Sequence, residues 1–244
     1  MHVKQFRAPK RLWFYPPDPI PPGELYLIGT IHRLPRLAPF LEDCLNMIRP
    51  EIITVEISPY SLRKRQREED LWLKRFEELR RRLSPQEREH PALLLYREAL
   101  KIPYEIKVAQ KWGQDRGIPV IPIDSSRVAK NWLKRLLSGL SWENFKALTR
   151  QERERYHLKH TLNLVAFYLR TGVLPSRDEE DLLRERLMLR RLRRIFQKKR
   201  PVVHIGGWGH LFSLAEALEK AIPIFIKGQT DLSFSFKSES FTEN

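Results

Sequence analysis

Residues 25–32 read LYLIGTIH and begin the pattern that indicates the fold class. The continuous apolar run at 25–29 is typical of a buried strand. Residues 36–48 then carry apolar side chains at helical spacing, and Pro50 ends that helix. A second apolar run, IITV at 52–55, stops at Glu56. Strand, helix and strand in so short a stretch predict a βαβ unit whose two strands are parallel neighbours.

Three more apolar runs extend this pattern, at 118–123 (IPVIPI), 201–205 (PVVHI) and 222–226. Helical periodicity fills the intervening segments, at 61–101, 104–116, 128–170, 178–199 and 211–220. We therefore expect an α/β fold, with mixed α+β as the variant. Its centre would be a mixed, largely parallel sheet flanked by helices and interrupted by long helical inserts.

The domain organisation follows from the ends of this pattern. Residues 1–23 are proline-rich and are expected to form an extended N-terminal arm. Residues 24–228 are expected to form a single domain. In the remaining segment, 229–244, Leu232, Phe234 and Phe236 alternate with polar residues, which indicates a tail or an edge strand.

Composition excludes several classes of protein. A chain of 244 residues with 41% hydrophobic residues can bury a core, so it is not globally disordered. The single cysteine, Cys44, excludes a disulfide framework and a cysteine-rich zinc site, and favours a cytoplasmic location. No apolar stretch reaches the length of a transmembrane segment, and the N-terminus lacks the apolar region of a secretory signal.

The net charge of +15 makes this a basic protein and raises the odds of an anionic partner, without choosing among nucleic acid, a membrane surface and an acidic substrate. Residues 184–200 hold nine Lys or Arg against one acidic residue, Glu185. A solvated helix is favoured over a nucleic-acid stripe, because neither an RNA or DNA motif nor interleaved aromatic residues accompany the run. A homo-oligomer is compatible with the sequence.

Polar side chains follow the predicted strands at or just beyond their carboxyl ends. They are His32, Glu56, Asp124 and His210. Ligands of parallel sheets bind at this edge, and two imidazoles with two carboxylates can hold a divalent metal that keeps open positions. Each also has an ordinary interpretation: a histidine bonded to backbone, a glutamate emerging into solvent, or Asp124 capping a helix.

Two glycines stand three residues before the histidines, Gly29 before His32 and Gly207 before His210. Glycine at the end of a strand permits a sharp turn or a close approach of a ligand. Each G-x-x-H motif is therefore expected to present its histidine from a tight turn. Of the other histidines, His157 and His160 are expected on an exposed helix face, and His204 in the core.

The chain resembles the TraB/PrgY/GumN family in several segments that occur in the family's order. They are LIGTIH (27–32), PEIITVEIS (50–58), YEIKVAQKWGQDRGIPVIPID (104–124), LLRERLM (182–188) and HIGGWGHL (204–211). The wider superfamily includes TIKI metalloproteases, ChaN-like haem-binding proteins and erythromycin esterases. The resemblance spans about residues 24–226.

This resemblance implies a divalent-metal site at the sheet edge, with manganese or cobalt favoured and zinc also suited to these residue types. His32 and His210 would match the motif histidines, and Glu56 the acidic residue after the second strand. Glu105 and Asp124 would match acidic positions of the central block. Arg186 would match the arginine of a late helix; Arg191 fits the helical spacing equally well, so the choice of Arg186 rests on the resemblance.

Together these features predict a metal-dependent hydrolase of the TraB/TIKI type that cleaves an amide (peptide) or ester bond with a metal-activated water. His32 and His210 would be metal ligands, Glu56 a third ligand or the general base, and Arg186 would stabilise negative charge. Gly29, Glu105, Asp124 and Gly207 would bind substrate or support the site. The alternative is a non-catalytic ligand-binding or regulatory module that holds a peptide, a haem-like molecule or an anion in the same crevice.

Overall fold

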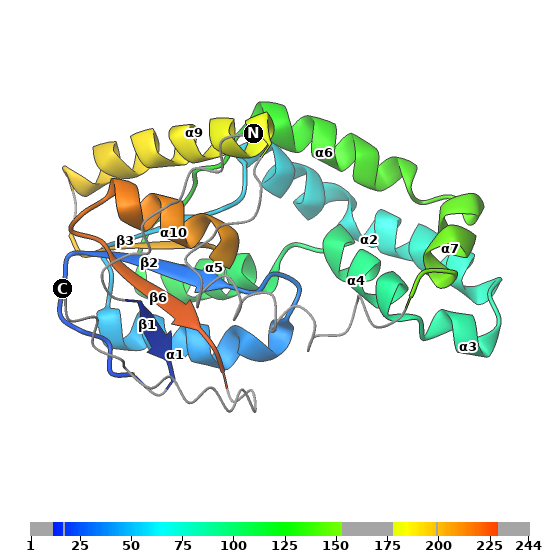
Figure 1. The fold of residues 1–244 in the computed structure, drawn as a ribbon, viewed down its shortest axis with the longest axis horizontal. Coiled ribbons are helices and arrows are strands. Elements are labelled where there is room, and N and C mark those ends of the chain that lie inside the picture. Colours follow the sequence, from blue (N-terminus) through cyan, green and yellow to red (C-terminus); the bar gives the residue numbers. More distant parts are fainter. Residues whose placement is uncertain (1–11, 17, 153–177, 199, 229–244) are drawn as a thin grey trace, which may run out of the picture.

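A six-stranded sheet forms the centre of the protein in a computed structural model that describes residues 12–16, 18–152, 178–198 and 200–228 (Figure 1). The strand order is β1-β6-β2-β5-β3-β4, and every pair is parallel. The strands are β1 (Trp13–Tyr15), β2 (Leu25–Thr30), β3 (Ile52–Val55), β4 (Val120–Pro122), β5 (Val202–Gly207) and β6 (Ile222–Ile226). The α/β class is confirmed, and the described sheet is parallel throughout.

Helices cover both faces of this sheet. The helices α1 (Ala38–Ile48) and α5 (Tyr104–Arg116) pack against each other on one face, and α9 (Glu179–Phe196) and α10 (Trp208–Ala217) pack on the other. A short 3-10 helix, η1 (Pro35–Leu37), leads into α1. The strands are buried between these layers, so their sequences are continuously apolar rather than alternating.

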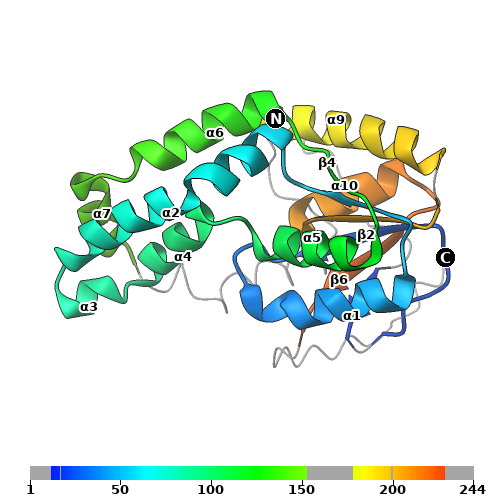
Figure 2. The ribbon, with the colours of Figure 1, turned by 180° about the vertical axis from the view of Figure 1, so that it is seen from behind.

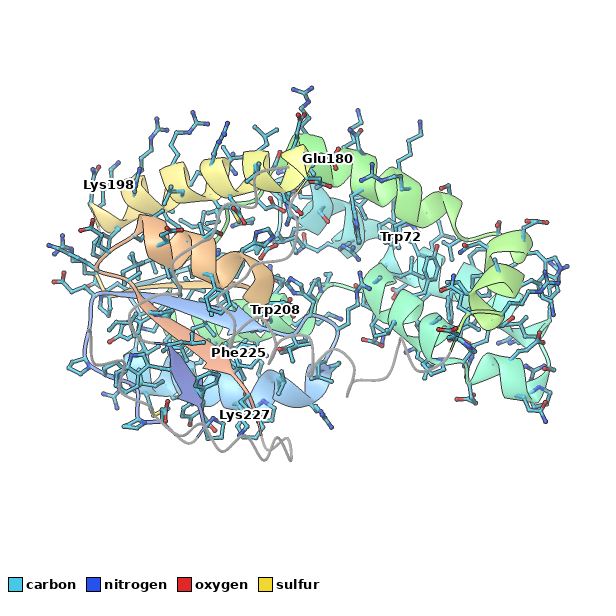
Figure 3. All side chains as sticks on the ribbon, viewed as in Figure 1. Trp72, Glu180, Lys198, Trp208, Phe225 and Lys227 are labelled. Carbon is cyan, nitrogen blue, oxygen red and sulfur yellow. The ribbon has the colours of Figure 1, made fainter. Side chains whose placement is uncertain are left out.

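A helical lobe lies beyond the carboxyl ends of the strands, as both views show (Figures 1 and 2). It consists of α2 (Pro59–Arg81), α3 (Pro85–Arg88), α4 (Pro91–Leu100), α6 (Ser126–Ser138) and α7 (Trp142–Thr149). The lobe has its own hydrophobic core around Phe76 and Phe145, with Trp72 at the position labelled in Figure 3. The predicted domain 24–228 thus contains two cores, one under the sheet and one in this lobe.

Serine N-caps fix where several lobe helices begin. The hydroxyls of Ser58, Ser84 and Ser125 accept hydrogen bonds from backbone N–H groups in the first turns of α2, α3 and α6. Proline at the first position of α2 and α3 supports the same start, because it lacks the N–H that would be unsatisfied there. The loops after β3 and β4 are therefore short and hold the lobe against the sheet edge.

Three features of the fold differ from the sequence-based expectations. The strands β2 and β3 are parallel but not neighbours, because β5 pairs with both and lies between them. Residues 13–15, which were expected in an extended arm, form an edge strand on β6. The helix expected at 211–220 begins earlier, because β5 runs through Gly207 and α10 begins at Trp208.

Some predictions fall outside the described residues. The alternating segment with Leu232, Phe234 and Phe236 lies there, as do His157, His160 and the end of the helical pattern at 128–170. Within the described residues, none of the helices has the length and apolarity needed to cross a membrane.

Candidate functional site

His32 lies two residues after the end of β2, in a turn at the carboxyl edge of the sheet. Its Nδ1 lies 2.5 Å from Oε1 of Glu105, a carboxylate of α5 whose side chain is 2% exposed. The imidazole itself is 43% exposed. Desolvation lowers the pKa of His32, but the charge and hydrogen bond of Glu105 outweigh it and leave this pKa above its ordinary value. The glutamate therefore orients the ring and favours its charged form.

His210 lies in the first turn of α10 and is held in the same way. Its Nδ1 is 2.7 Å from Oε1 of Glu185, which comes from the buried face of α9. Its Nε2 lies 3.3 Å from Oε1 of Glu56. Each of the two motif histidines thus has Nδ1 bonded to a buried glutamate, an arrangement that fixes the ring and leaves Nε2 for a ligand or a proton.

Glu56 follows β3 and lies between several positive groups. Its Oε1 is 2.7 Å from Nη2 of Arg184, and its Oε2 accepts a 2.7 Å hydrogen bond from the backbone N–H of Gly207. Burial alone would raise the pKa of Glu56. The charges of His210, His32 and Arg184 and the Gly207 hydrogen bond lower it to about 2. Glu56 is consequently a carboxylate at any physiological pH.

Asp124 follows β4 and binds the same arginine. Nε and Nη2 of Arg184 lie 3.0–3.2 Å from its carboxylate oxygens, and Asp181 pairs with Nη1. Burial opposes the charge of Arg184, but Glu56 and Asp124 raise its pKa above the ordinary value. The expectation that Asp124 caps a helix is wrong, because Ser125 caps α6. Asp124 instead bonds to Arg184 and to the N–H of Ser125.

Two glycines allow these groups to approach. A Cβ on Gly207 would come within 2.4 Å of Nε2 of His32, and one on Gly206 within 2.7 Å of Oε2 of Glu56. Any side chain at Gly207 would therefore displace the histidine. Gly29 has a different use, because a Cβ there would meet Leu211 and the backbone of Trp208 on α10.

The structure thus brings most of the predicted site residues together. His32, Glu56, Asp124 and His210 line one cavity of about 410 Å³ between the sheet edge and the helical lobe. Glu105 lies directly behind His32, and Gly207 between His32 and Glu56. The prediction that His210 sits in a tight turn is wrong, because α10 carries it.

Arg186 is not part of this group. It is exposed on α9, and Arg184, two residues earlier, makes the contacts with Glu56 and Asp124. Arg191 binds the carbonyl groups of Ile123 and Asp124 and so fixes the loop after β4. In Figure 3 several other long side chains of α9 project away from the sheet, with Lys198 at one end of the helix and Glu180 at the other.

Sequence reasoning missed Arg184 and Glu185. The missed signal for Glu185 is its spacing from Met188 and Leu192, which share the buried face of α9. A carboxylate on an apolar face requires a partner, and His210 is that partner. Arg184 carries no comparable signal, because arginines occur all along this helix.

His204, the expected core histidine, is buried in β5, with Nδ1 3.0 Å from the hydroxyl of Thr54. Burial lowers its pKa to about 4, so the ring is neutral at physiological pH. This neutral ring adds no charge to the neighbouring Glu56.

The donor types at this site suit a divalent metal, since two imidazoles with carboxylate-bound Nδ1 atoms stand beside a third carboxylate. As the side chains lie, however, no three or more His, Cys, Asp or Glu residues in the described part of the chain form a group that could hold a metal ion. Glu56 is bonded to Arg184 and Gly207 instead. Binding a metal through Glu56 would require Oε1 to leave Arg184 or Oε2 to leave the N–H of Gly207.

Comparisons of the chain with protein-family models, with curated proteins and with solved structures find no match. The function is therefore inferred from the arrangement of the two His–Glu pairs, Glu56 and Arg184.

Proposed function

We propose that the protein is a hydrolase of amide or ester bonds whose centre consists of His32, Glu56 and His210. The observation that carries this proposal is the pairing of each histidine Nδ1 with a buried glutamate, at 2.5 Å for Glu105 and 2.7 Å for Glu185. Holding two imidazole rings in fixed orientations at the edge of a ligand-sized cavity is typical of histidines whose Nε2 binds a ligand or exchanges a proton. The resemblance to the TraB and TIKI proteins favours a peptide substrate.

A divalent metal is part of this proposal, with manganese or cobalt preferred by resemblance and zinc by donor type. Nε2 of His32, Nε2 of His210 and a carboxylate oxygen of Glu56 would hold it. Once bound, the metal would supply Lewis-acid polarisation of the scissile carbonyl and a water of lowered pKa.

The neighbouring side chains orient the histidines and balance charge at the proposed centre. Glu105 and Glu185 orient the two rings, and the N–H of Gly207 holds Glu56 in place. The low pKa of Glu56 favours a role as ligand over a role as general base, because an effective base has a pKa near the working pH. Arg184 stays charged and is placed to stabilise negative charge that develops near Glu56.

The test begins with chelator-treated protein, to which manganese, cobalt or zinc is added at fixed ionic strength. Metal uptake and hydrolysis of peptide and ester libraries are then measured. We expect uptake near one ion per chain and hydrolysis that depends on it. The His32→Ala, His210→Ala double variant should lose both, while Arg186→Ala, an exposed position on α9, should keep them.

Unchanged hydrolysis in the double variant would refute the proposed centre. The alternative, a ligand-binding or regulatory module, would show peptide, haem-like or anion binding that survives chelation, without turnover. That outcome would favour binding over catalysis, with the same cavity as the site.

A further inference from the structure

Arg33 stands directly beside His32 and lines the same cavity. Its φ is 64°, so this residue occupies the left-handed region, which a non-glycine residue adopts at a cost. Strained backbone of this kind persists where the surrounding structure enforces it and is concentrated at functional sites. The turn at 32–33 therefore places an arginine at the cavity at some cost to the chain.

Arg33 is exposed to solvent, and the charge of the buried Glu105 acts on it from beyond ion-pair distance. Among the described residues, Arg33 has neither a hydrogen bond nor an ion pair. The other basic side chains of the cavity differ in this respect: Lys101 pairs with Glu98, Arg135 with Glu180, and Arg184 with Glu56 and Asp124. An exposed guanidinium that lines a cavity and makes no ion pair has N–H donors available to a group that enters.

A second guanidinium, that of Arg65, lines the same cavity and is buried at 3% exposure. Its Nη1 donates to the carbonyl groups of Ala99, Leu100 and Lys101 at the end of α4, at 2.6–2.8 Å. Nε donates to the hydroxyl of Ser61 at 3.3 Å, and Nη2 makes no hydrogen bond to a described residue. These uncharged acceptors hold the side chain but do not neutralise its charge. The ring of Trp132, also in the cavity wall, lies 5.6 Å from the guanidinium carbon.

The two arginines line the same cavity, and the charge of Arg33 acts on that of Arg65. Burial lowers the pKa of Arg65 to about 10, Glu69 opposes this, and the charge of Arg33 adds to the lowering. Glu69 itself is bonded to the N–H of Ile102 and to Lys107. Two like charges beside one cavity repel each other, and an anion between them would remove that repulsion.

We propose that Arg33 and Arg65 form a subsite for an anionic oxygen group, a carboxylate or a phosphate, held in the cavity beside His32. The guanidinium of Arg33 can bind either anion through paired N–H donors, Arg65 adds Nη2, and the burial of Arg65 strengthens its bond to an anion. The consequence for substrate rests on the proposed hydrolase function: the scissile bond lies close to a negative group. For a peptide, the free C-terminal carboxylate meets this description, so cleavage takes place near the C-terminus.

Anion binding is tested first without catalysis. The full chain is titrated with sodium acetate and, separately, with sodium phosphate at fixed ionic strength, and the Nε–H resonances of Arg33 and Arg65 are followed by NMR. Arg33→Gly is the main variant, because glycine adopts the positive φ of this turn freely and keeps the backbone. Arg36→Ala, an exposed arginine of η1 outside the cavity, is the matched control.

We expect saturable binding that weakens at least tenfold in Arg33→Gly, weakens less in Arg33→Lys, and is unchanged in Arg36→Ala. Saturation by acetate assigns the subsite to carboxylates, and saturation by phosphate alone assigns it to phosphate groups. Saturation by neither anion, or equal affinity in Arg33→Gly and the wild type, overturns the proposal.

Hydrolysis is measured separately, on one peptide with a free C-terminus and on its C-terminal amide. A carboxylate subsite predicts a preference of about tenfold or more in kcat/KM for the free acid, lost in Arg33→Gly. Equal rates for acid and amide would overturn the substrate assignment. Anion binding without any turnover would leave the subsite standing and count against the hydrolase proposal alone.

Discussion

Nη2 of Arg184 lies 2.7 Å from Oε1 of Glu56, and the same guanidinium binds Asp124 through two nitrogens. The side chains of Glu56 and Asp124 are 4% and 9% exposed, so neither carboxylate is well solvated. Arg184 therefore joins the ends of β3 and β4 to α9 and neutralises two buried charges at the centre of the site.

Replacing Arg184 should consequently destabilise the fold. In Arg184→Ala, Glu56 and Asp124 lose their shared cation, and breaking a buried pair in this way costs about 3 kcal/mol or more. Arg186→Ala, two positions away and exposed, should change the free energy of unfolding by less than about 0.5 kcal/mol. Urea denaturation of both variants measures the difference. Equal free energies of unfolding in the two variants would show that Arg184 does not stabilise the fold.

The low pKa of Glu56 links the stability of the fold to acid pH. A carboxylate whose pKa falls from its ordinary 4.5 to about 2 on folding stabilises the folded state above pH 4.5, and this contribution is lost as the pH falls toward 2. The wild type should therefore lose more stability than Glu56→Gln between pH 4.5 and 2.5. Denaturation midpoints at these two pH values provide the measurement, with Glu42→Gln, an exposed glutamate, as control. Parallel losses in the wild type and Glu56→Gln would contradict the assignment.

The Glu105 contact should set the titration of His32. Because the carboxylate raises the pKa of this imidazole, Glu105→Gln should lower it. NMR titration of the ring, assigned from the spectrum of His32→Asn, measures the change, and Glu98→Gln serves as a control that lines the same cavity. An unchanged titration in Glu105→Gln would mean that the carboxylate does not govern the ring.

Gly207 and Gly209 form a matched pair for testing the site. A Cβ at Gly207 would lie 2.4 Å from Nε2 of His32, whereas a Cβ at Gly209 would meet nothing within 4 Å. Gly207→Ala should displace His32 and abolish turnover while the chain still folds. Gly209→Ala, within α10, should keep activity and raise stability by about 0.5–1 kcal/mol. Activity and thermal unfolding of the two variants are compared, and full activity in Gly207→Ala would contradict the geometry described here.

Much of the fold is encoded in local patterns. The runs at 52–55 and 222–226 coincide with β3 and β6, because continuous apolar segments between turn residues are the signature of strands buried on both faces. The order of strands is not local information. Nothing in residues 25–55 indicates that β5, some 150 residues later, inserts between β2 and β3.

The site was predictable to a similar extent. His32, Glu56 and Asp124 follow strands, and parallel strands bring such residues to one edge, so their meeting could be expected. Glu105, at the start of α5, came from the resemblance alone. The role of Arg184 depends on the rotation of α9 about its axis, which the sequence does not fix for a helix with arginines on several sides.

The proposed function requires that His32, Glu56 and His210 serve one centre. Hydrolysis of a single peptide substrate by His32→Asn, Glu56→Gln, His210→Asn and the triple variant tests this most directly. Residues that act as a unit are non-additive, so each single variant should lose nearly all activity and the triple variant no more than the singles. Losses that multiply across the three positions, or full activity in any single variant, would contradict a common centre.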